Sequence, residues 1–303
     1  MWSHEDFLTL PDTSFFGVEM DKKKFIALSN SYLDLTQYDS DYIDFNKMSI
    51  TYHSCKLEGI PYSHADTYMI LKHGIYPDNI QHPNYITRLE DHHEALKVVL
   101  ELAEQKKELS VDTIQDLSAT ILKNEEKLYP SPNGTFDGRK GHFRRVNVSY
   151  GIEPRRSGID FHVIPSHVAS LVEDINSRIK TFSGDIFKIY DFAFEIQLKT
   201  VTIHPFINGN SRLSRLLMNY IQHYHQCPLS IILLRDKPKY WKALYQSQDT
   251  NDLKYFQSFM LNQTKKFLRT RVKQLSPQKE ICFEKTKERI LDKDNSYQGE
   301  VSY

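Results

Sequence analysis

The segment from His204 to Arg215 constrains this chain more than any other stretch. It reads His-Pro-Phe-Ile-Asn-Gly-Asn-Ser-Arg-Leu-Ser-Arg, and apolar segments with helical periodicity precede and follow it. A loop that opens onto a helix N-terminus presents free backbone N–H groups to an anion, and the helix dipole favours negative charge there. Arginine forks suit phosphate oxygens, and a histidine can take a proton near neutral pH. The segment therefore predicts chemistry on a phosphorylated ligand.

Composition limits the kind of protein. A chain of 303 residues can bury a large core, and its 39 basic and 39 acidic side chains balance. The charge thus gives no reason to expect a nucleic-acid partner or membrane binding. The cysteines, Cys55, Cys227 and Cys282, are too few and too far apart for a zinc site or a disulfide framework, so we expect a reducing, cytoplasmic location. The N-terminal sequence is not basic, and we expect neither a signal peptide nor a membrane span.

Helical periodicity dominates the chain, so the predicted fold class is all-α with a small β-hairpin. Before the central segment we predict helices over about 22–35, 48–58, 63–72, 89–103, 111–122, 165–179 and 185–201. After it we predict helices over about 213–224, 240–245 and 253–267. Gly59 followed by Pro61 is a common helix ending, and Ser63 or Asp66 is the expected N-cap of the helix that follows.

The predicted β-hairpin lies between the helical segments. Residues 130–141 are rich in proline, glycine and asparagine and are predicted to be loop. Residues 146–150 and 159–163 alternate apolar and polar side chains, which is typical of strands, and residues 151–158 can turn the chain. The adjacent His92-His93 pair and the pair His223 and His225 diverge on their helices, so no structural metal site is predicted there.

We expect three regions. Residues 1–85 form an N-terminal helical region that begins with an irregular arm, and residues 86–270 form the core domain. Residues 271–303 are charged and polar, and we interpret them as a C-terminal helix or tail. Because these residues are too few for a domain, we expect no DNA binding.

The central segment resembles the signature of Fic-domain proteins, HPFx(D/E)GNGRxxR. The matching positions are His204, Pro205, Phe206, Gly209, Asn210, Arg212 and Arg215. The stretch Gly141-His142-Phe143-Arg144 and the alternating residues after it resemble the β-hairpin "flap" of the family. Tyr240-Trp241 resembles the aromatic pair that flanks the nucleotide. The resemblance covers about residues 48–270 and implies a Fic-type helical core.

The resemblance implies an activity. The usual reaction of the family is transfer of AMP from ATP, with Mg²⁺, to a hydroxyl group of a target protein. His204 would then be the general base that takes the proton of the attacking hydroxyl. The backbone amides of Gly209, Asn210 and Ser211 would hold phosphate oxygens, and the Asn210 side chain would donate to the α-phosphate. Arg212 would hold the β-phosphate of the leaving group.

Further positions follow from the same resemblance. Arg215 would meet the γ-phosphate, and Tyr240 and Gln248 would lie at the nucleotide. The flap residues Val148, Tyr150 and Gly151 would hold an unknown protein target by strand addition, although a hairpin of this kind can also be mere scaffold. Proteins of this family often pair their cores, so a homodimer is possible.

Two positions depart from the signature. Asn208 stands where the family has an acid that helps to bind magnesium, and an amide oxygen ligates a hard cation without adding negative charge. Ser211 stands where the family has glycine. We therefore expect Asn208 to be a weak metal ligand and transfer to be slow. The alternatives are a phosphotransferase or other nucleotidyl transferase of the Fic/Doc type, and a nucleotide-binding regulatory protein with weakened catalysis.

An upstream segment fits the self-inhibitory pattern of many Fic proteins, (S/T)xxxE(G/N). Ser54, Glu58 and Gly59 carry the match. The resemblance implies that Glu58 pairs with Arg215 and occupies the space of the γ-phosphate, while Ser54 steadies the helix. A solvated glutamate in front of a helix-ending glycine is the alternative for this loose pattern.

Overall fold

The computed structural model describes residues 22–77, 83–125, 128–132, 134–182 and 184–297, with side chains described up to residue 276. The predicted N-terminal arm lies outside the described residues. The all-α prediction is confirmed, since helices account for most of the chain and the strands form two small antiparallel hairpins. The described helices do not include one with the length and apolar composition that a membrane span requires.

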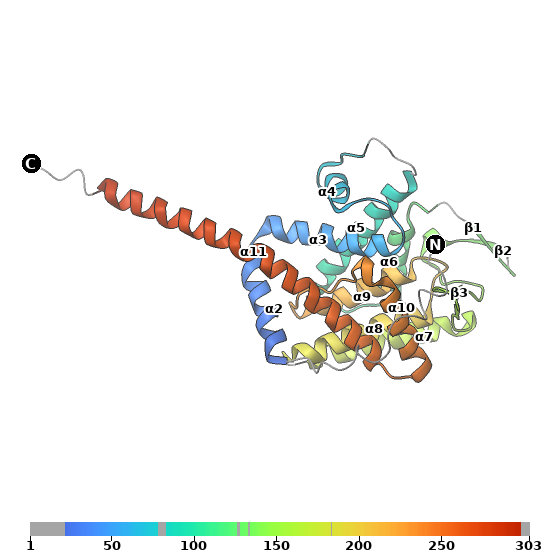
Figure 1. Cartoon of the computed structure of the whole chain (residues 1–303). Helices are drawn as coiled ribbons and strands as arrows, with labels where there is room; N and C mark the ends of the chain where they lie inside the picture. Colours follow the sequence, from blue (N-terminus) through green and yellow to red (C-terminus); the bar gives the residue numbers. More distant parts are fainter. Residues whose placement is uncertain (1–21, 78–82, 126–127, 133, 183, 298–303) are drawn as a thin grey trace, which may run out of the picture.

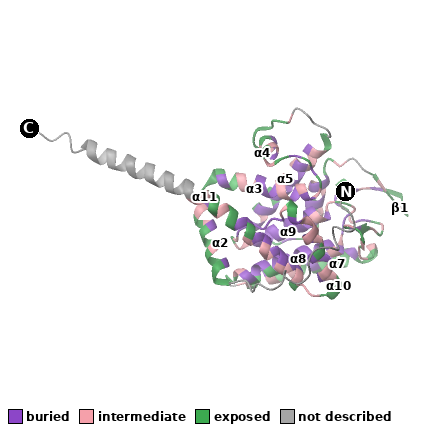
Figure 2. Ribbon diagram, in the orientation of Figure 1, coloured by how far each residue is buried: buried purple, intermediate pink, exposed green. Residues whose placement is uncertain are grey.

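The core forms around α8 (Ile186–Ile203) and α9 (Asn210–Tyr224), which pack against each other in the centre of the molecule (Figure 1). Most of the side chains of α8 and α9 are buried, and Figure 2 shows both helices largely in purple. The α8 helix is apolar on most of its faces and must be covered on most of them. The α9 helix also buries polar residues, such as Arg212 and Arg215, whose side chains are hydrogen-bonded. The predicted helices on either side of the central segment therefore become the buried centre of the fold.

Other helices surround this pair. The α5 helix (Pro83–Glu104) packs on α9, and α6 (Val111–Leu122) packs on α5 and α9. The α10 helix (Lys237–Thr250) and α11 (Lys254–Tyr297) follow α9, and the first part of α11 lies against α2 (Lys22–Thr36) and α8. One hydrophobic cluster includes residues of α2, α3 and α5 through α11, and Ile70 of α4 packs in a second, smaller cluster. The boundaries at 85/86 and 270/271 fall inside α5 and α11, and the division into three regions stays a prediction.

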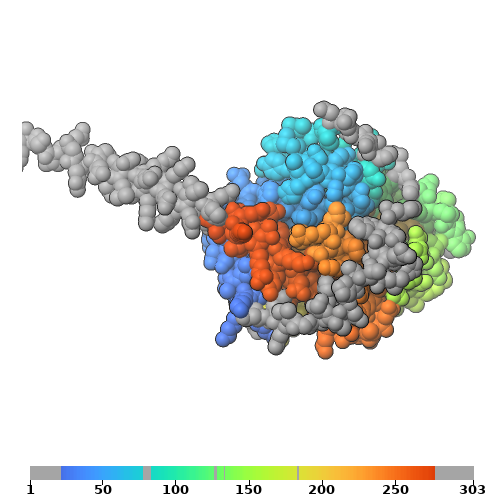
Figure 3. Space-filling view, in the orientation of Figure 1, coloured from blue at the N-terminus to red at the C-terminus, as the bar shows by residue number. Residues whose placement is uncertain are grey.

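The α3 helix (Ser40–Leu57) begins earlier than predicted. Asp39 caps it by accepting a hydrogen bond of 2.9 Å from the backbone N–H of Tyr42. The helix ends at Leu57 as predicted, because Gly59 adopts a φ of 85° that favours glycine. The next helix, α4 (His64–His73), has Ser63 as its N-cap, with Asp66 completing a capping box. Figure 3 shows the blue-to-cyan surface of α3 and α4 next to the orange surface that leads into α10.

The hairpins differ from the sequence prediction. Residues 130–141 are not all loop, because β1 (Leu128–Ser131) pairs with β2 (Gly134–Asp137). The predicted strand over 146–150 is reduced to β3 (Ser149–Tyr150), and its partner is β4 (Arg156–Ser157). The predicted strand over 159–163 is wrong, since residues 161–163 form a 3-10 turn. Side chains there form hydrogen bonds with backbone groups that would otherwise pair in a strand ladder. For example, Asn147 Oδ1 accepts from the N–H of Phe161 at 3.0 Å.

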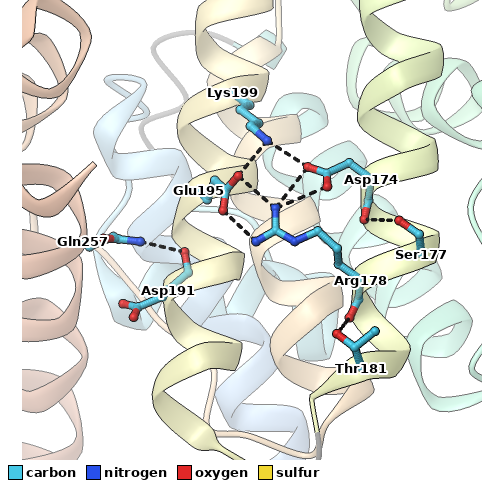
Figure 4. A network of polar contacts seen from close by, with 8 residues as sticks. All are labelled: Asp174, Ser177, Arg178, Thr181, Asp191, Glu195, Lys199 and Gln257. Carbon is cyan, nitrogen blue, oxygen red and sulfur yellow. Dashed lines mark hydrogen bonds and ion pairs between the residues drawn. The ribbon is translucent and has the colours of Figure 1, made fainter. Parts of the chain in front are cut away.

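A charge network joins α7 (Ile164–Arg178) to α8, as Figure 4 shows. Arg178 donates two hydrogen bonds of 3.0 Å to the two carboxylate oxygens of Glu195. Lys199 bridges Glu195 at 2.7 Å and Asp174 at 2.8 Å. Bidentate arginine pairs within a network contribute more to stability than isolated surface pairs do. The network thus fixes the helix whose C-terminal end carries His204.

Candidate active site

The central loop connects the C-terminus of α8 to the N-terminus of α9, two helices that pack against each other. His204 caps the C-terminus of α8 in the left-handed conformation, with φ 51° and ψ 59°. Gly209 forms the N-cap of α9 with φ 78°, and a Cβ atom there would lie 3.1 Å from the Ile121 side chain. Only glycine adopts that φ without strain at so close an approach. The first N–H groups of α9 have no acceptor within the helix, as at every helix N-terminus.

Arg144 holds the loop from the flap side, and its side chain is 1% exposed. Its Nε donates to the His204 carbonyl at 2.8 Å, and its backbone N–H donates to the Pro205 carbonyl at 3.0 Å. Its other nitrogens donate to the carbonyls of Val146 and Ile159. One buried guanidinium therefore joins the flap to the strained backbone of His204. Burial lowers the pKa of this guanidinium.

Asn210 braces the loop from within. Its Oδ1 accepts a hydrogen bond of 2.9 Å from the N–H of Phe206, and its Nδ2 donates to the Phe206 carbonyl at 2.8 Å. The side chain is 2% exposed. The expected donor to an α-phosphate is therefore already engaged at both ends of its amide, and its observed contacts are structural.

His204 lies beneath the flap. The ring of Tyr150 stacks on its imidazole, with ring centroids 4.5 Å apart and planes at 10°. Burial lowers the pKa of His204 to about 4; Arg144 also lowers it, whereas the contact with the Val201 carbonyl and the charge of Glu58 raise it. The imidazole is therefore neutral at pH 7. Its Nδ1 lies 3.4 Å from the Val201 carbonyl, which favours the tautomer in which Nε2 has a free lone pair.

A cavity of about 320 Å³ opens beside His204. It brings together several predicted residues from distant parts of the chain: Glu58, Tyr150, Gly151, His204, Ser211, Arg215 and Tyr240. Trp241, the second residue of the predicted aromatic pair, also lines it, and so does Lys237, which the sequence did not mark. The Lys237 ammonium donates to the Leu57 carbonyl at 2.7 Å, at the end of α3. The cavity thus combines a neutral imidazole, cationic groups and aromatic walls, which suits an anionic ligand with an aromatic part.

The end of α3 closes the cationic side of this cavity. Arg215 Nη2 donates to Glu58 Oε1 at 2.7 Å, and Arg215 Nε donates to Ser54 Oγ at 2.8 Å. The Arg215 side chain is 6% exposed and that of Glu58 is 27% exposed. Burial alone would raise the pKa of Glu58, but Arg215, Arg212 and Lys237 together bring it below its usual value. The carboxylate is therefore charged at pH 7 and occupies the anion position beside Arg215.

Arg212 and Asn208 lie outside the lining of the cavity. The side chain of Arg212 is 1% exposed, and its Nη2 donates to Glu125 Oε1 at 2.9 Å. Asn208 is exposed, and its Nδ2 donates to Glu125 Oε2 at 2.8 Å. Glu125 was missed in the sequence, because it stands far upstream in the loop after α6 and no motif marks it. Only the tertiary structure brings its carboxylate to these two residues.

Gln248 was expected at the nucleotide, but it does not line the cavity. Its Nε2 donates to the hydroxyl of Tyr150 and to Thr202 Oγ1, both at 2.8 Å. The neighbouring Tyr245 hydroxyl contacts both the N–H and the carbonyl of Ile152, at 2.8 and 2.9 Å. These α10 residues therefore hold the flap over His204. Val148 belongs to the flap but not to the cavity lining, and its carbonyl accepts from the N–H of Gly158 at 2.9 Å.

A divalent cation has few protein donors here. Within the described residues there is no cluster of three or more histidine, cysteine or acidic side chains that could hold a metal ion. Asn208 and Glu125 carry oxygens beside the loop, but Asn208 Oδ1 accepts from the N–H of Gly209 at 2.7 Å and its Nδ2 faces Glu125, so a metal ion would have to replace these contacts. This set fits an ion that takes most of its ligands from substrate phosphates and water, as magnesium commonly does.

Comparison with known proteins gives consistent results. Residues 108–222 match the model of the Fic/DOC family. The chain is 28% identical over 220 residues to proteins named protein adenylyltransferase Fic from Drosophila persimilis and Drosophila melanogaster. These matches cover 72% of this chain but only 39% and 40% of the relatives. The chain therefore spans about two fifths of the length of these curated relatives.

Solved structures share the fold. A Fic domain-containing signaling protein from Bacteroides thetaiotaomicron superposes with a TM-score of 0.71 at 21% identity, covering 84% of this chain and 97% of that protein. Fic-1 from C. elegans, residues 134–508, superposes with a TM-score of 0.64 at 19% identity, covering 84% of this chain and 72% of the other. At these identities the likeness establishes the fold alone.

Proposed function

This chain belongs to the Fic/DOC family, and from that premise we propose that it is a protein adenylyltransferase held at low activity by Glu58. The observation that carries the proposal is the cavity in which a neutral His204 lies beside Arg215, Ser211 and the N-terminus of α9. That arrangement combines a base with an anion site in one space. The activity of the named relatives supports the choice of AMP transfer.

In the proposed reaction His204 acts as the general base. Its Nε2 takes the proton of a serine, threonine or tyrosine hydroxyl on the target protein, and the hydroxyl oxygen attacks the α-phosphorus of ATP. The bond between the α-phosphorus and the bridging oxygen breaks, and pyrophosphate leaves. Because the imidazole is neutral at pH 7, no prior deprotonation is required. The parallel ring of Tyr150 restricts the rotation of the imidazole.

The phosphates would be held at the N-terminus of α9. The backbone N–H groups of Asn210 and Ser211 have no acceptor within the helix and can bind phosphate oxygens. Arg215 and Lys237 line the same cavity and add fixed positive charge. A bound magnesium ion would be held by Asn208 and Glu125 on the protein side and would neutralise charge on the phosphates. The aromatic side chains of Tyr240 and Trp241 would contact the nucleoside.

Glu58 would inhibit the enzyme by competing with the nucleotide. Its carboxylate holds Arg215 at 2.7 Å, so a phosphate cannot take the same donor without displacing it. Lys237 holds the end of α3 through the Leu57 carbonyl and so keeps Glu58 in place. Removal of this carboxylate would free a buried cation and enlarge the cavity. We propose that ATP then binds with its terminal phosphate at Arg215.

The target would bind along the flap. The β3–β4 hairpin carries Tyr150 over His204, and this supports an extended target segment beside the imidazole. However, the Val148 carbonyl and both backbone groups of Ile152 already have partners. We further propose that the chain can form a homodimer and that it is cytoplasmic. The wide spacing of the cysteines supports the location.

One labelling experiment tests the reaction. The Glu58→Gly variant is incubated with ATP that carries an isotope on either the α- or the γ-phosphate, with Glu58→Gly/His204→Ala as the matched control. Stable label from the α-phosphate, lost in the control, is the expected result. Label from the γ-phosphate would instead show a phosphotransferase, as the serine at position 211 keeps possible. Binding of ATP without label from either position would identify a regulatory nucleotide-binding protein.

A further inference from the structure

Glu125 lies where two residues of the central segment, Asn208 and Arg212, meet a second arginine, Arg88. Its Oε2 accepts a hydrogen bond from Asn208 at 2.8 Å, and its Oε1 accepts one from Arg212 at 2.9 Å. The Nε of Arg88, on α5, forms an ion pair with the same Oε1 at 3.3 Å. The Glu125 side chain is only 12% exposed. One nearly buried carboxylate is therefore shared by three groups from different elements.

The segment that carries Glu125 is itself anchored. The backbone N–H of Asn124 donates to Asp91 Oδ2 at 3.0 Å, and the Asn124 side-chain amide donates to Asp91 Oδ1 at 2.8 Å. Asp91 is a buried residue of α5, where it is 5% exposed. This pair fixes the chain immediately before Glu125. The carboxylate is therefore held in place relative to α5 and α9, and it has the character of a fixed support rather than of a mobile latch.

Arg212 is held on one side only. Its Nη1 donates to the Ile121 carbonyl at 3.2 Å and its Nη2 to Glu125, whereas its buried Nε has no hydrogen-bond partner among the described residues. A buried charged donor without an acceptor is costly unless a ligand completes it. The charge of Arg212 also helps to lower the pKa of Glu58, the carboxylate that Arg215 binds. The free donor of this guanidinium is thus suited to an oxygen of an anion.

We propose that Glu125 is the positioning residue of the anion site, which fixes Arg212 and Asn208 for a polyphosphate and supplies the negative charge that Asn208 lacks. The proposal rests on the proposed function for the identity of the ligand as a nucleoside triphosphate. Position 208 has an uncharged amide in the sequence, but the fold brings a carboxylate to 2.8 Å from that amide. The acidic group of the site therefore comes from the loop after α6, not from the central loop.

The test measures binding rather than turnover. In the Glu58→Gly background, the affinities for pyrophosphate, ATP and adenosine are measured by calorimetry for Glu125→Gln, Glu125→Asp, Arg212→Gln and the double variant Glu125→Gln/Arg212→Gln. Glu173→Gln, at an exposed position of α7, is the matched control. Because a charge-assisted hydrogen bond is lost, Glu125→Gln should weaken pyrophosphate and ATP binding about tenfold. Adenosine binding should not change, and Glu125→Asp should restore part of the loss.

The double variant separates positioning from a general structural effect. If Glu125 acts through Arg212, its substitution should have little further effect once Arg212 is glutamine. Equal losses for adenosine and ATP, or fully additive losses, would overturn the proposal, and so would tighter binding by Glu125→Gln. ATP binding that does not depend on Glu125 would leave the proposed function intact. If pyrophosphate binds in a Glu125-dependent way and ATP does not bind, the nucleotide is rejected as the ligand and the positioning role of Glu125 is supported. Binding of none of the probes would reject both.

Discussion

The ring of Tyr150 covers the imidazole of His204, with centroids 4.5 Å apart and the two planes within 10° of parallel. Tyr150 comes from the flap and His204 from the end of α8, so the stack couples the two parts of the site. The Tyr150 hydroxyl accepts from Gln248 on α10, which keeps the ring in this position. The cover removes His204 from water, and this burial is the largest cause of its low pKa.

Removal of this cover should raise the pKa of His204. In Tyr150→Ala we expect a rise from about 4 toward 6.5, because water then stabilises the imidazolium. The acid limb of transfer by the Glu58→Gly enzyme should move upward in the same direction, since a protonated His204 cannot accept a proton. NMR titration of the His204 imidazole measures the shift, and Tyr38→Ala, at an exposed position, is the control. An unchanged pKa would mean that other groups bury the ring.

The low pKa of His204 implies that the stability of the fold depends on pH. A histidine whose folded pKa lies below its unfolded value favours the folded state above the unfolded pKa, near 6.5. This contribution is lost as pH falls toward about 4, because the unfolded chain then binds the proton more readily. His204→Gln should therefore lose less stability than the wild type between pH 6.5 and pH 4. Urea unfolding at several pH values measures the difference. If the free energy of unfolding depends on pH equally in both proteins, the prediction is wrong.

Loss of the Glu58 carboxylate should activate the enzyme and destabilise the fold. Glu58→Gly should raise ATP-dependent self-labelling above wild type and lower the free energy of unfolding by about 3 kcal/mol, because it leaves a buried Arg215 without its counter-ion. ATP should restore part of that stability. Intact-protein mass spectrometry and thermal unfolding measure the two effects.

Glu58→Gln separates charge from space in this inhibition. It keeps a hydrogen-bond acceptor and removes the charge, so intermediate labelling is expected. The pKa of Glu58 is lowered in the fold, so the stabilisation by this pair is present above the unfolded pKa of about 4.5 and is lost only as pH falls through the lower folded value. Mild acid should therefore not activate the wild type. Wild-type labelling equal to that of Glu58→Gly would refute the inhibitory role.

Asn208→Asp should create a repulsion that a metal ion relieves. The new carboxylate would stand beside Glu125, where the amide now donates at 2.8 Å. Without metal we expect a loss of about 1 kcal/mol, since like charges at hydrogen-bond distance repel. With Mg²⁺ the stability should return, and transfer in the Glu58→Gly background should increase. Thermal unfolding with and without Mg²⁺ measures the first effect. The control, Asn208→Asp/Glu125→Gln, should show no loss without metal.

Arg144 should matter for geometry more than for charge. Arg144→Lys keeps the charge but cannot reach the carbonyls of His204, Val146 and Ile159 together. We expect a loss of about 3 kcal/mol in stability and at least about tenfold lower kcat in the Glu58→Gly background, with little change in the KM for ATP. Steady-state kinetics below the melting temperature separate kcat from KM. A selective rise in KM would instead place Arg144 at the nucleotide.

Sequence periodicity predicted most of the helices because each buries an apolar stripe. It predicted the strand over 146–150 only in part, missed β1 and β2, and placed the partner strand wrongly at 159–163. There, the side chains of Asn147 and Asp160 accept from backbone N–H groups in place of a strand ladder. The motif residues His204, Ser211 and Arg215 could be predicted because adjacent positions in one loop stay adjacent in the fold. Gln248 and Asn210 lie near the site, but Gln248 holds the flap and Asn210 holds the central loop. Sequence periodicity does not predict such side-chain contacts.

The helical class, the signature loop and the pairing of Glu58 with Arg215 could be predicted from the sequence, because they depend on local pattern and motif spacing. The other contacts of the site became visible only in the folded chain: Glu125 binds Arg212 and Asn208, and Tyr150 covers His204. These contacts join residues far apart in the chain, and their strength depends on burial, which local pattern does not contain. The residue types of the central loop therefore indicate the reaction, and the packing around the loop sets the charge states of His204 and Glu58.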